Sequence, residues 1–290
     1  MKRVLITGSG SFIGMSLERY LKDYPYHVDT LDMRGDDWQK ADFSGYDVVF
    51  HVASIVHLKE KEDMKALYFR VNRDLAIQTA QKAKDAGVGQ FIFMSSASVY
   101  GDGAPIGSTR CITAGTEPSP LTFYGHSKLQ AEQGLFEMQS EAFRVVVLRP
   151  PMVYGPGCKG NYPTLSKMAR KLPFFPVVDN QRSMIYIDHL SEFVRLMIEN
   201  REQGLFHPQN STYSNTTQLV EQIAAANGKK IRLVKGITGI LKLLSGLTPM
   251  VNKAFGSLTY DMALSHYPQD YCRYTQEETV TFTEAAVTNR

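Results

Sequence analysis

Short apolar runs alternate with longer helical patterns over the first two-thirds of the chain. The runs are four or five residues long and rich in β-branched and aromatic side chains, which is typical of buried strands. Within Met64–Gly87, apolar residues such as Leu67 and Val71 recur at four-residue steps, which predicts a helix that stops at the glycine. The predicted strands are Val4–Thr7, His27–Leu31, Val48–Val52, Phe91–Met94 and Val145–Leu148.

Strands and helices that alternate in this way predict an α/β fold with a doubly wound parallel sheet, covered by helices on both faces. After Arg149 prolines crowd the chain, and a strand-like Met184–Ile187 then leads into a helix over Leu190–Asn200. We therefore expect a smaller, irregular C-terminal lobe that binds the substrate. The expected division is a sheet domain over 1–155, to which 182–203 return, and a substrate lobe of 156–181 and 204–290.

Composition narrows the classes of function. The 290 residues are 43% hydrophobic and carry a net charge of +3 that is spread along the chain, so no basic face for nucleic acid is expected. The most apolar late stretch, Gly236–Leu258, is interrupted by Lys242 and Pro249 and predicts an amphipathic or core helix, not a membrane span. Three scattered cysteines favour reduced thiols and a cytoplasmic location.

A glycine-rich turn follows the first predicted strand and opens a helix. It reads TGSGSFIG, with glycines at Gly8, Gly10 and Gly14, and Ile13 stands where the GxGxxG fingerprint has its last glycine. Glycines at such a turn let the backbone approach a pyrophosphate, whose charge then lies at the helix N-terminus. The turn therefore predicts a Rossmann-type dinucleotide site.

An acidic residue ends the second predicted strand, as a dinucleotide site requires. Asp32 lies 24 positions after Gly8, where its carboxylate can accept both ribose hydroxyls. A carboxylate there repels a 2′-phosphate and favours NAD over NADP, although the neighbouring Arg34 is a residue type that NADP sites use. Asp42 and Phe43 precede the next strand and could hold the adenine edge, or form an ordinary loop.

Tyrosine and lysine lie four residues apart in YGHSK and share one face of a predicted helix, as Tyr124 and Lys128. A phenol with a pKa near 10 is a poor base at neutral pH, and an adjacent ammonium would bring its pKa toward the working range. Upstream, a predicted strand ends in Ser95-Ser96, whose hydroxyls could bind a reacting oxygen. Together these residues predict acid–base chemistry beside a dinucleotide.

With these motifs the chain resembles the extended short-chain dehydrogenase/reductase family, and in particular its NAD-dependent nucleotide-sugar epimerase/dehydratase branch. The similarity spans roughly residues 2 to 200 and weakens thereafter. It rests on several blocks in the family's order, which are TGSGSFIG, DVVFHVAS, FIFMSSASVYGD, YGHSK, LRPPMVYGPG and RSMIYIDHL.

The resemblance implies a role for each matching residue. Tyr124 would be the general base and acid, Lys128 would hold the nicotinamide ribose and tune the tyrosine, and Ser96 would bind the reacting hydroxyl. Besides Tyr124 and Lys128, the implied cofactor-binding residues are Gly8, Gly10, Ser11, Phe12, Ile13, Gly14, Asp32, Met33, Asp42, Phe43, Val52, Ala53, Ser54, Asn72, Met94 and Pro151. The implied substrate-binding residues are Ser98, Met152, Asn161 and Arg182, the arginine being matched to the substrate pyrophosphate.

Three departures from the family's pattern bear on function. The family's middle glycine is Ser11 here, a modest intrusion that could itself donate to phosphate. Dehydratases carry Asp-Glu after the catalytic hydroxyl residue, whereas this chain has Ala97 and Ser98, which argues against a 4,6-dehydratase. The asparagine that many sugar epimerases have before VYG is Met152, and Asn161 could supply an equivalent amide.

The sequence therefore favours, slightly, an NAD-dependent UDP- or dTDP-sugar 4-epimerase that acts through a transient 4-keto sugar. A nucleotide-4-keto-sugar reductase needs the same Ser-Tyr-Lys triad and is the alternative; a non-catalytic NAD-binding scaffold is a third hypothesis. His51 and His57 lack a second ligand at usable spacing, so no metal is expected. Faces of helices within Met64–Ala86 and Lys128–Gln139 commonly pair in this family, which implies a homodimer.

Overall fold

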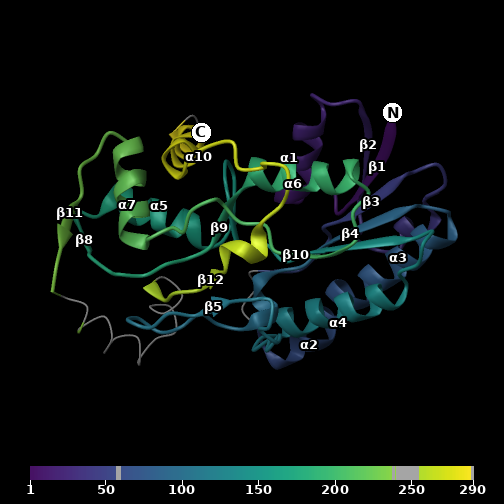
Figure 1. The fold of residues 1–290 in the computed structure, drawn as a ribbon, viewed down its shortest axis with the longest axis horizontal. Helices are drawn as coiled ribbons and strands as arrows, with labels where there is room; N and C mark the ends of the chain where they lie inside the picture. Colours follow the sequence, from purple (N-terminus) through teal and green to yellow (C-terminus); the bar gives the residue numbers. More distant parts are fainter. Residues whose placement is uncertain (57–59, 237–238, 240–254, 289–290) are drawn as a thin grey trace. The chain divides into compact units, whose positions relative to one another are not determined.

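A computed structural model describes residues 1–56, 60–236, 239 and 255–288, which form two compact units (Figure 1). The units do not follow the expected division at every boundary. The later return to the sheet unit covers Leu190–Pro208, where 182–203 was expected, and Asp102–Thr116 leaves that unit. Unit 1 consists of Met1–Gly101, Glu117–Pro150 and Leu190–Pro208, and unit 2 of Asp102–Thr116, Pro151–His189 and Gln209–Arg290.

Unit 1 is built on a six-stranded sheet in which every neighbouring pair is parallel, so the predicted fold class is confirmed. The strand order is β10-β6-β4-β3-β1-β2. After β2 the chain therefore crosses to the other side of β1, and the carboxyl ends of β1 and β3 form the switch point where open sheets bind ligands. The strands are β1 Lys2–Thr7, β2 Tyr26–Leu31, β3 Val48–His51, β4 Gln90–Met94, β6 Arg144–Leu148 and β10 Gly204–Phe206.

Helices α1 and α6 lie along one face of this sheet, and α3 and α4 along the other (Figure 1). On the α3–α4 side, aromatic and β-branched strand residues such as Phe91 and Val145 meet small or apolar helix residues such as Ala80, Ala131 and Leu135, all fully buried. Alanines allow the helices to pack closely on the sheet. The helices are α1 Phe12–Leu21, α2 Lys65–Phe69, α3 Leu75–Asp85, α4 Phe123–Glu137 and α6 Ile187–Glu199, with short η1 Asp37–Lys40, η2 Glu62–Met64 and η4 Ala97–Tyr100.

The single helix predicted over Met64–Gly87 is interrupted. Between α2 and α3 the backbone forms a π-helical segment, η3, over Arg70–Asp74. Its buried Asn72 points away from the helix, where its amide bonds to other elements. Single π turns inside α-helices are rare, and they are frequent at functional sites.

Unit 2 is irregular, as expected, with three helices and three parallel two-stranded sheets in its described part. The predicted strand near Met184 is present as β9. The helix expected in Gly236–Leu258 lies largely outside the described residues, and no described helix is long and apolar enough to cross a membrane. The elements are β5 Cys111–Ile112, β7 Met152–Tyr154, α5 Asn161–Lys171, β8 Phe174–Pro176, β9 Met184–Tyr186, α7 Thr216–Ala226, β11 Arg232–Val234, β12 Thr259–Tyr260, η5 Met262–Ser265 and α10 Gln276–Thr288.

The core under α4 leads to a stability prediction. Leu135→Ala should lower the free energy of unfolding by about 2–5 kcal/mol, because it leaves a cavity where a fully buried side chain packs. Leu121→Ala is the matched control, since 65% of Leu121 is exposed, and it should change stability by less than about 0.5 kcal/mol. Urea unfolding followed by circular dichroism measures both. Equal losses would contradict the placement of this core.

Candidate active site

The glycine-rich turn between β1 and α1 needs glycine for two reasons. Gly8 and Gly10 have φ angles of 111° and 75°, a region that side chains disfavour. A Cβ on Gly8 would also stand 2.7 Å from the backbone nitrogen of Ala53, which follows β3. The N–H groups of Gly8 and Ser9 donate to the carbonyl of Leu31 at 2.8 and 3.1 Å. The turn is therefore tied to the ends of both strands that flank β1.

Ser11, which replaces the family's glycine, is the N-cap of α1. Its side-chain oxygen accepts from the N–H of Gly14 at 3.1 Å, so the substitution supplies a standard helix start. Gly14 in turn sits against Ile6 and Val52, whose side chains would lie 3.2 Å from a Cβ at this position. The N-terminus of α1, with Phe12 and Ile13 in its first turn, lies directly after β1 at the switch point.

Asp32 follows β2 and is held by Arg34. The Arg34 Nε donates to both carboxylate oxygens at 3.0 and 2.9 Å, and the Arg34 side chain lowers the pKa of Asp32 to about 2. The carboxylate is therefore charged at neutral pH. The pair is exposed, with 44% of the Asp32 side chain and 89% of the Arg34 side chain accessible. An exposed pair holds its partners weakly, so either group can turn toward a ligand.

Buried apolar side chains lie close to the turn. Met33, Trp38 and Ala53 form one cluster, against which Leu31 and Leu75 pack. Ala53 is also the residue that Gly8 approaches. Met33, Val52 and Ala53, three of the expected cofactor residues, thus gather around the ends of β2 and β3. Trp38 was not anticipated there, because an isolated tryptophan in a polar loop gives no signal for a ligand site.

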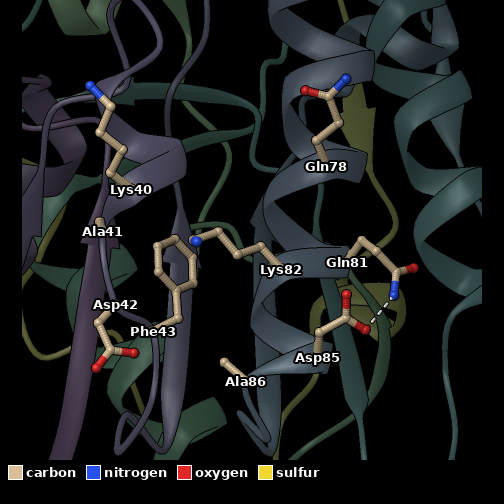
Figure 2. Close-up of a pocket in the computed structure, with 9 residues that line it drawn as sticks. All are labelled: Lys40, Ala41, Asp42, Phe43, Gln78, Gln81, Lys82, Asp85 and Ala86. Carbon is tan, nitrogen blue, oxygen red and sulfur yellow. Dashed lines mark hydrogen bonds between the residues drawn. The ribbon is translucent and has the colours of Figure 1, made fainter.

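Asp42 and Phe43 lie elsewhere, on an open groove between the chain before β3 and helix α3 (Figure 2). The Phe43 ring is 1% exposed, packs in the main core and has the Lys82 ammonium 5.3 Å from its centre. The Asp42 carboxylate accepts from the backbone N–H and the hydroxyl of Ser44, both at 2.8 Å. The Phe43 side chain is thus part of the core, and the role of this pair at the adenine edge stays a prediction.

Tyr124 is the second residue of α4, and the side chains of two serines influence its hydroxyl. Burial raises the pKa of the phenol to about 12, while hydrogen bonds to the Ser96 and Ser54 side chains lower it. Ser96 follows β4 and Ser54 follows β3, so the phenol lies at the carboxyl ends of the central strands. The Ser96 hydroxyl also lies 3.1 Å from that of Ser98 and accepts from the Ser98 N–H. Ser54, expected to line the dinucleotide, here contacts the tyrosine.

Lys128 lies one helical turn after Tyr124 and is buried, with 1% of its surface exposed. Its Nζ donates to the carbonyl of Met94 at 2.8 Å and lies 4.5 Å from the centre of the Phe93 ring. Burial lowers the pKa of the ammonium to about 7, and the negative charge of Glu132 opposes that shift. The same Nζ is 5.9 Å from the centre of the Tyr124 ring. The ammonium therefore lies beside the phenol at the end of β4.

Two further residues hold this arrangement together. Asn72 bonds both the N–H and the carbonyl of Ile55, at 2.9 and 3.1 Å, and donates to the Ser127 hydroxyl at 3.2 Å. It thereby joins the segment after β3 to α4. Glu60, which the sequence did not single out, accepts from the N–H groups of Phe123 and Tyr124 at 2.8 and 3.0 Å and caps α4. The partners of Glu60 lie 63 and 64 positions away, so no local motif reveals it.

A buried polar network behind Lys128 was also missed. Glu132, one turn further along α4, accepts from the Nε of Arg149 at 3.1 and 3.2 Å and from the Ser95 hydroxyl. Arg149 donates to the Tyr100 hydroxyl at 2.6 Å, which is 2.7 Å from the Nε2 of His207. The sequence gives one local sign of this network, namely a glutamate four residues after the lysine of YGHSK.

The remaining expected residues are placed as follows. Pro151, Met152, Asn161 and Arg182 belong to unit 2, with Asn161 exposed at the start of α5 and burial lowering the pKa of Arg182. His51 is fully buried, its Nδ1 lies 2.8 Å from the Thr7 hydroxyl, and burial lowers its pKa to about 3. Among the described residues no group of three His, Cys, Asp or Glu side chains is arranged to hold a metal ion.

Comparison with known proteins places these features in a family. The model of the NAD dependent epimerase/dehydratase family matches residues 4–213. A UDP-glucose 4-epimerase from Vibrio cholerae is 29% identical, with 90% of this chain and 88% of that protein covered, and a GDP-6-deoxy-D-mannose reductase from Pseudomonas aeruginosa is 25% identical, with 81% and 83% covered.

Solved structures agree on the fold. A UDP-glucuronic acid 4-epimerase from Bacillus cereus in complex with NAD superposes with a TM-score of 0.73 at 19% identity, with 99% of both chains covered. RMD from Pseudomonas aeruginosa, complexed with NADPH, gives 0.74 at 19% identity, with 98% of this chain and 99% of that chain covered. The fold is thus the Rossmann type that the turn predicted, and the enzyme class expected from the resemblance is confirmed. This protein belongs to the NAD dependent epimerase/dehydratase family.

Proposed function

We propose that the protein is a nucleotide-sugar 4-epimerase in which Ser96, Tyr124 and Lys128 form the catalytic triad. The observation that carries the proposal is the position of Tyr124 near the carboxyl ends of β3 and β4, where the Ser54 and Ser96 side chains that follow these strands oppose the rise that burial causes in the phenol pKa. The ammonium of Lys128 lies one turn away on the same helix face. A phenol in such surroundings can exchange a proton with a sugar hydroxyl.

The residues around the turn fit NAD. Among the described residues, no atom lies within 4 Å of where a Cβ on Gly10 would stand, so the crest of the turn leaves space for a pyrophosphate. Asp32 is charged and accessible for the ribose hydroxyls, and its negative charge would repel a 2′-phosphate. NAD bound there would supply a hydride acceptor for the sugar carbon, and its reduced form a hydride donor to the opposite face of the 4-keto sugar.

In that reaction the three side chains would transfer the proton of the sugar hydroxyl or stabilise the charge that the transfer creates. Tyr124 as phenolate takes the proton of the 4-hydroxyl, and the oxygen becomes the carbonyl of the keto sugar. Ser96 donates a hydrogen bond to the reacting oxygen, and the Lys128 ammonium stabilises the phenolate. Arg182 would pair with the substrate's pyrophosphate and Ser98, Met152 and Asn161 would contact the sugar. We expect UDP- or dTDP-sugar substrates and a homodimer.

A 4-keto-sugar reductase is the second candidate, favoured by the similarity to the GDP-6-deoxy-D-mannose reductase. An epimerase reuses its cofactor, whereas a reductase releases it oxidised after each turnover. We therefore expect the purified protein, when denatured, to release NAD in a near-stoichiometric amount, measured by absorbance after chromatography. Protein that is isolated empty and oxidises added NADH with a 4-keto sugar would support the reductase instead.

Tyr124→Phe tests the triad. The variant should lose about 10²- to 10⁴-fold in kcat, because it keeps the ring but removes the proton acceptor. Its cofactor content and melting curve should match those of the unmodified protein. Tyr46→Phe is the control, since the Tyr46 hydroxyl bonds Asp29 on the outer strand and should not affect turnover. Full activity in Tyr124→Phe would rule out the mechanism.

Asp32→Asn tests the choice of cofactor. NAD should bind about 10- to 100-fold more weakly, since a hydrogen bond to a charged group contributes about 1.5–3 kcal/mol. NADP should bind more tightly than before, because Arg34 is released from the carboxylate. Isothermal titration with each dinucleotide measures both effects, and Arg34→Ala, which keeps the carboxylate, should retain the preference for NAD. An unchanged ratio in Asp32→Asn would show that Asp32 does not contact the ribose.

A further inference from the structure

We propose that Glu132 is a positioning residue for the active site, which holds the Lys128 ammonium in its charged form and fixes the strand end that carries Ser96. The inference rests on the proposed function, because it assigns a role to a residue that acts through that triad. Glu132 does not touch the phenol or the reacting hydroxyl. Along α4, Glu132 follows Lys128 by one helical turn, and Tyr124 precedes Lys128 by one turn.

The Glu132 carboxylate is related to two residues of the proposed triad: it shares a helix face with Lys128, and it binds the residue before Ser96. On α4, Glu132 follows Lys128 by four residues, so the two side chains share a helix face. At the end of β4, the Lys128 Nζ donates to the carbonyl of Met94, and the next residue, Ser95, donates its hydroxyl to Glu132. Ser96 comes directly after. A movement of the Glu132 carboxylate would therefore disturb the end of β4, which contacts the lysine through Met94 and carries Ser96.

The ion pair that Glu132 makes is not explained by stability alone. Glu132 is 1% exposed and Arg149 is 5% exposed, so both charges have been removed from water. Such pairs gain little over well-packed apolar side chains, because desolvation offsets their attraction. Removing one partner, in contrast, leaves an uncompensated charge in the interior. We therefore relate the Glu132–Arg149 pair to its effect on the charge of Lys128.

The groups around Lys128 identify the charge that affects the pKa of its ammonium. From α4 these are Glu132 and the Tyr124 phenol, and from β4 they are the Phe93 ring and the Met94 carbonyl. From β3, His51 is kept uncharged by its burial. Arg149, at the end of β6, reaches Lys128 only through its partner. Among the described residues, Glu132 is thus the negative group that opposes the effect of burial on the lysine pKa.

Two charge-removing variants should move the lysine in opposite directions. In Glu132→Gln the amide keeps an acceptor for Ser95 but loses the charge, so the pKa of Lys128 should fall by about one pH unit or more. In Arg149→Gln the Glu132 carboxylate is kept, but the arginine that competes with Lys128 for its negative charge is removed. The pKa of Lys128 should therefore rise. The probe is the full-length protein labelled with ¹³C at the lysine Cε carbons, titrated by NMR, with Lys128→Met identifying the signal.

Glu192→Gln is the matched control, because Glu192 is a second buried partner of an arginine, Arg195, outside the triad. It should lower stability without moving the Lys128 titration. Glu132→Asp keeps the charge and should titrate as the unmodified protein does. If Glu132→Gln does not fold, Arg149→Gln decides the matter, and an unmoved or lowered pKa there overturns the inference. Shifts in the same direction for both charge-removing variants would overturn it as well.

The pH dependence of kcat separates this inference from the proposed function. If turnover needs the ammonium, kcat falls as pH rises through the pKa of Lys128, and this alkaline limb should follow the NMR midpoint in each variant. A shifted NMR midpoint with an unmoved limb supports the role of Glu132 and contradicts the role of Lys128 in the proposed mechanism. An unmoved midpoint in folded Glu132→Gln contradicts the role of Glu132 whatever the turnover.

Discussion

Burying a lysine ammonium removes it from water, and the surrounding chain has to supply partners for its charge. Lys128 finds them in the Met94 carbonyl, the face of the Phe93 ring and the carboxylate of Glu132. The first two belong to β4 and the third to its own helix. These contacts fix α4 against β4, and so they also fix the phenol of Tyr124, one turn earlier on the helix, beside the end of the strand.

The parallel sheet explains why distant segments meet at this phenol. Strands β1, β3 and β4 are neighbours and point the same way, so Gly8, Ser54 and Ser96, each just beyond its strand, gather at one edge. The close approach of Gly8 to Ala53 brings the glycine-rich turn against the end of β3. Asn72 and Glu60 then bind the segment after β3 to α4, which sets the distance between this turn and Tyr124.

Features of the chain that recur at a fixed spacing were predicted from the sequence. The strands, the glycine turn and the Tyr124–Lys128 pair are all local patterns, and each is where the sequence indicates. Contacts between remote segments were not predicted, as the cap that Glu60 forms on α4 illustrates. The burial of Phe43 in the main core was likewise not predicted, because the sequence does not show which elements surround the ring.

The shifted pKa values of Tyr124 and Lys128 have a common cause. Burial favours the neutral form of every ionisable group, and it accordingly raises the pKa of Tyr124 to about 12 and lowers that of Lys128 to about 7. A neutral phenol beside a neutral amine and a phenolate beside an ammonium differ by the place of one proton. Only the second pair can accept a proton from a sugar hydroxyl at the phenol. The Ser54 and Ser96 hydroxyls favour charge on the oxygen, and Glu132 favours charge on the nitrogen. These polar groups therefore oppose, at both ends, the effect of burial, which keeps that proton on the phenol.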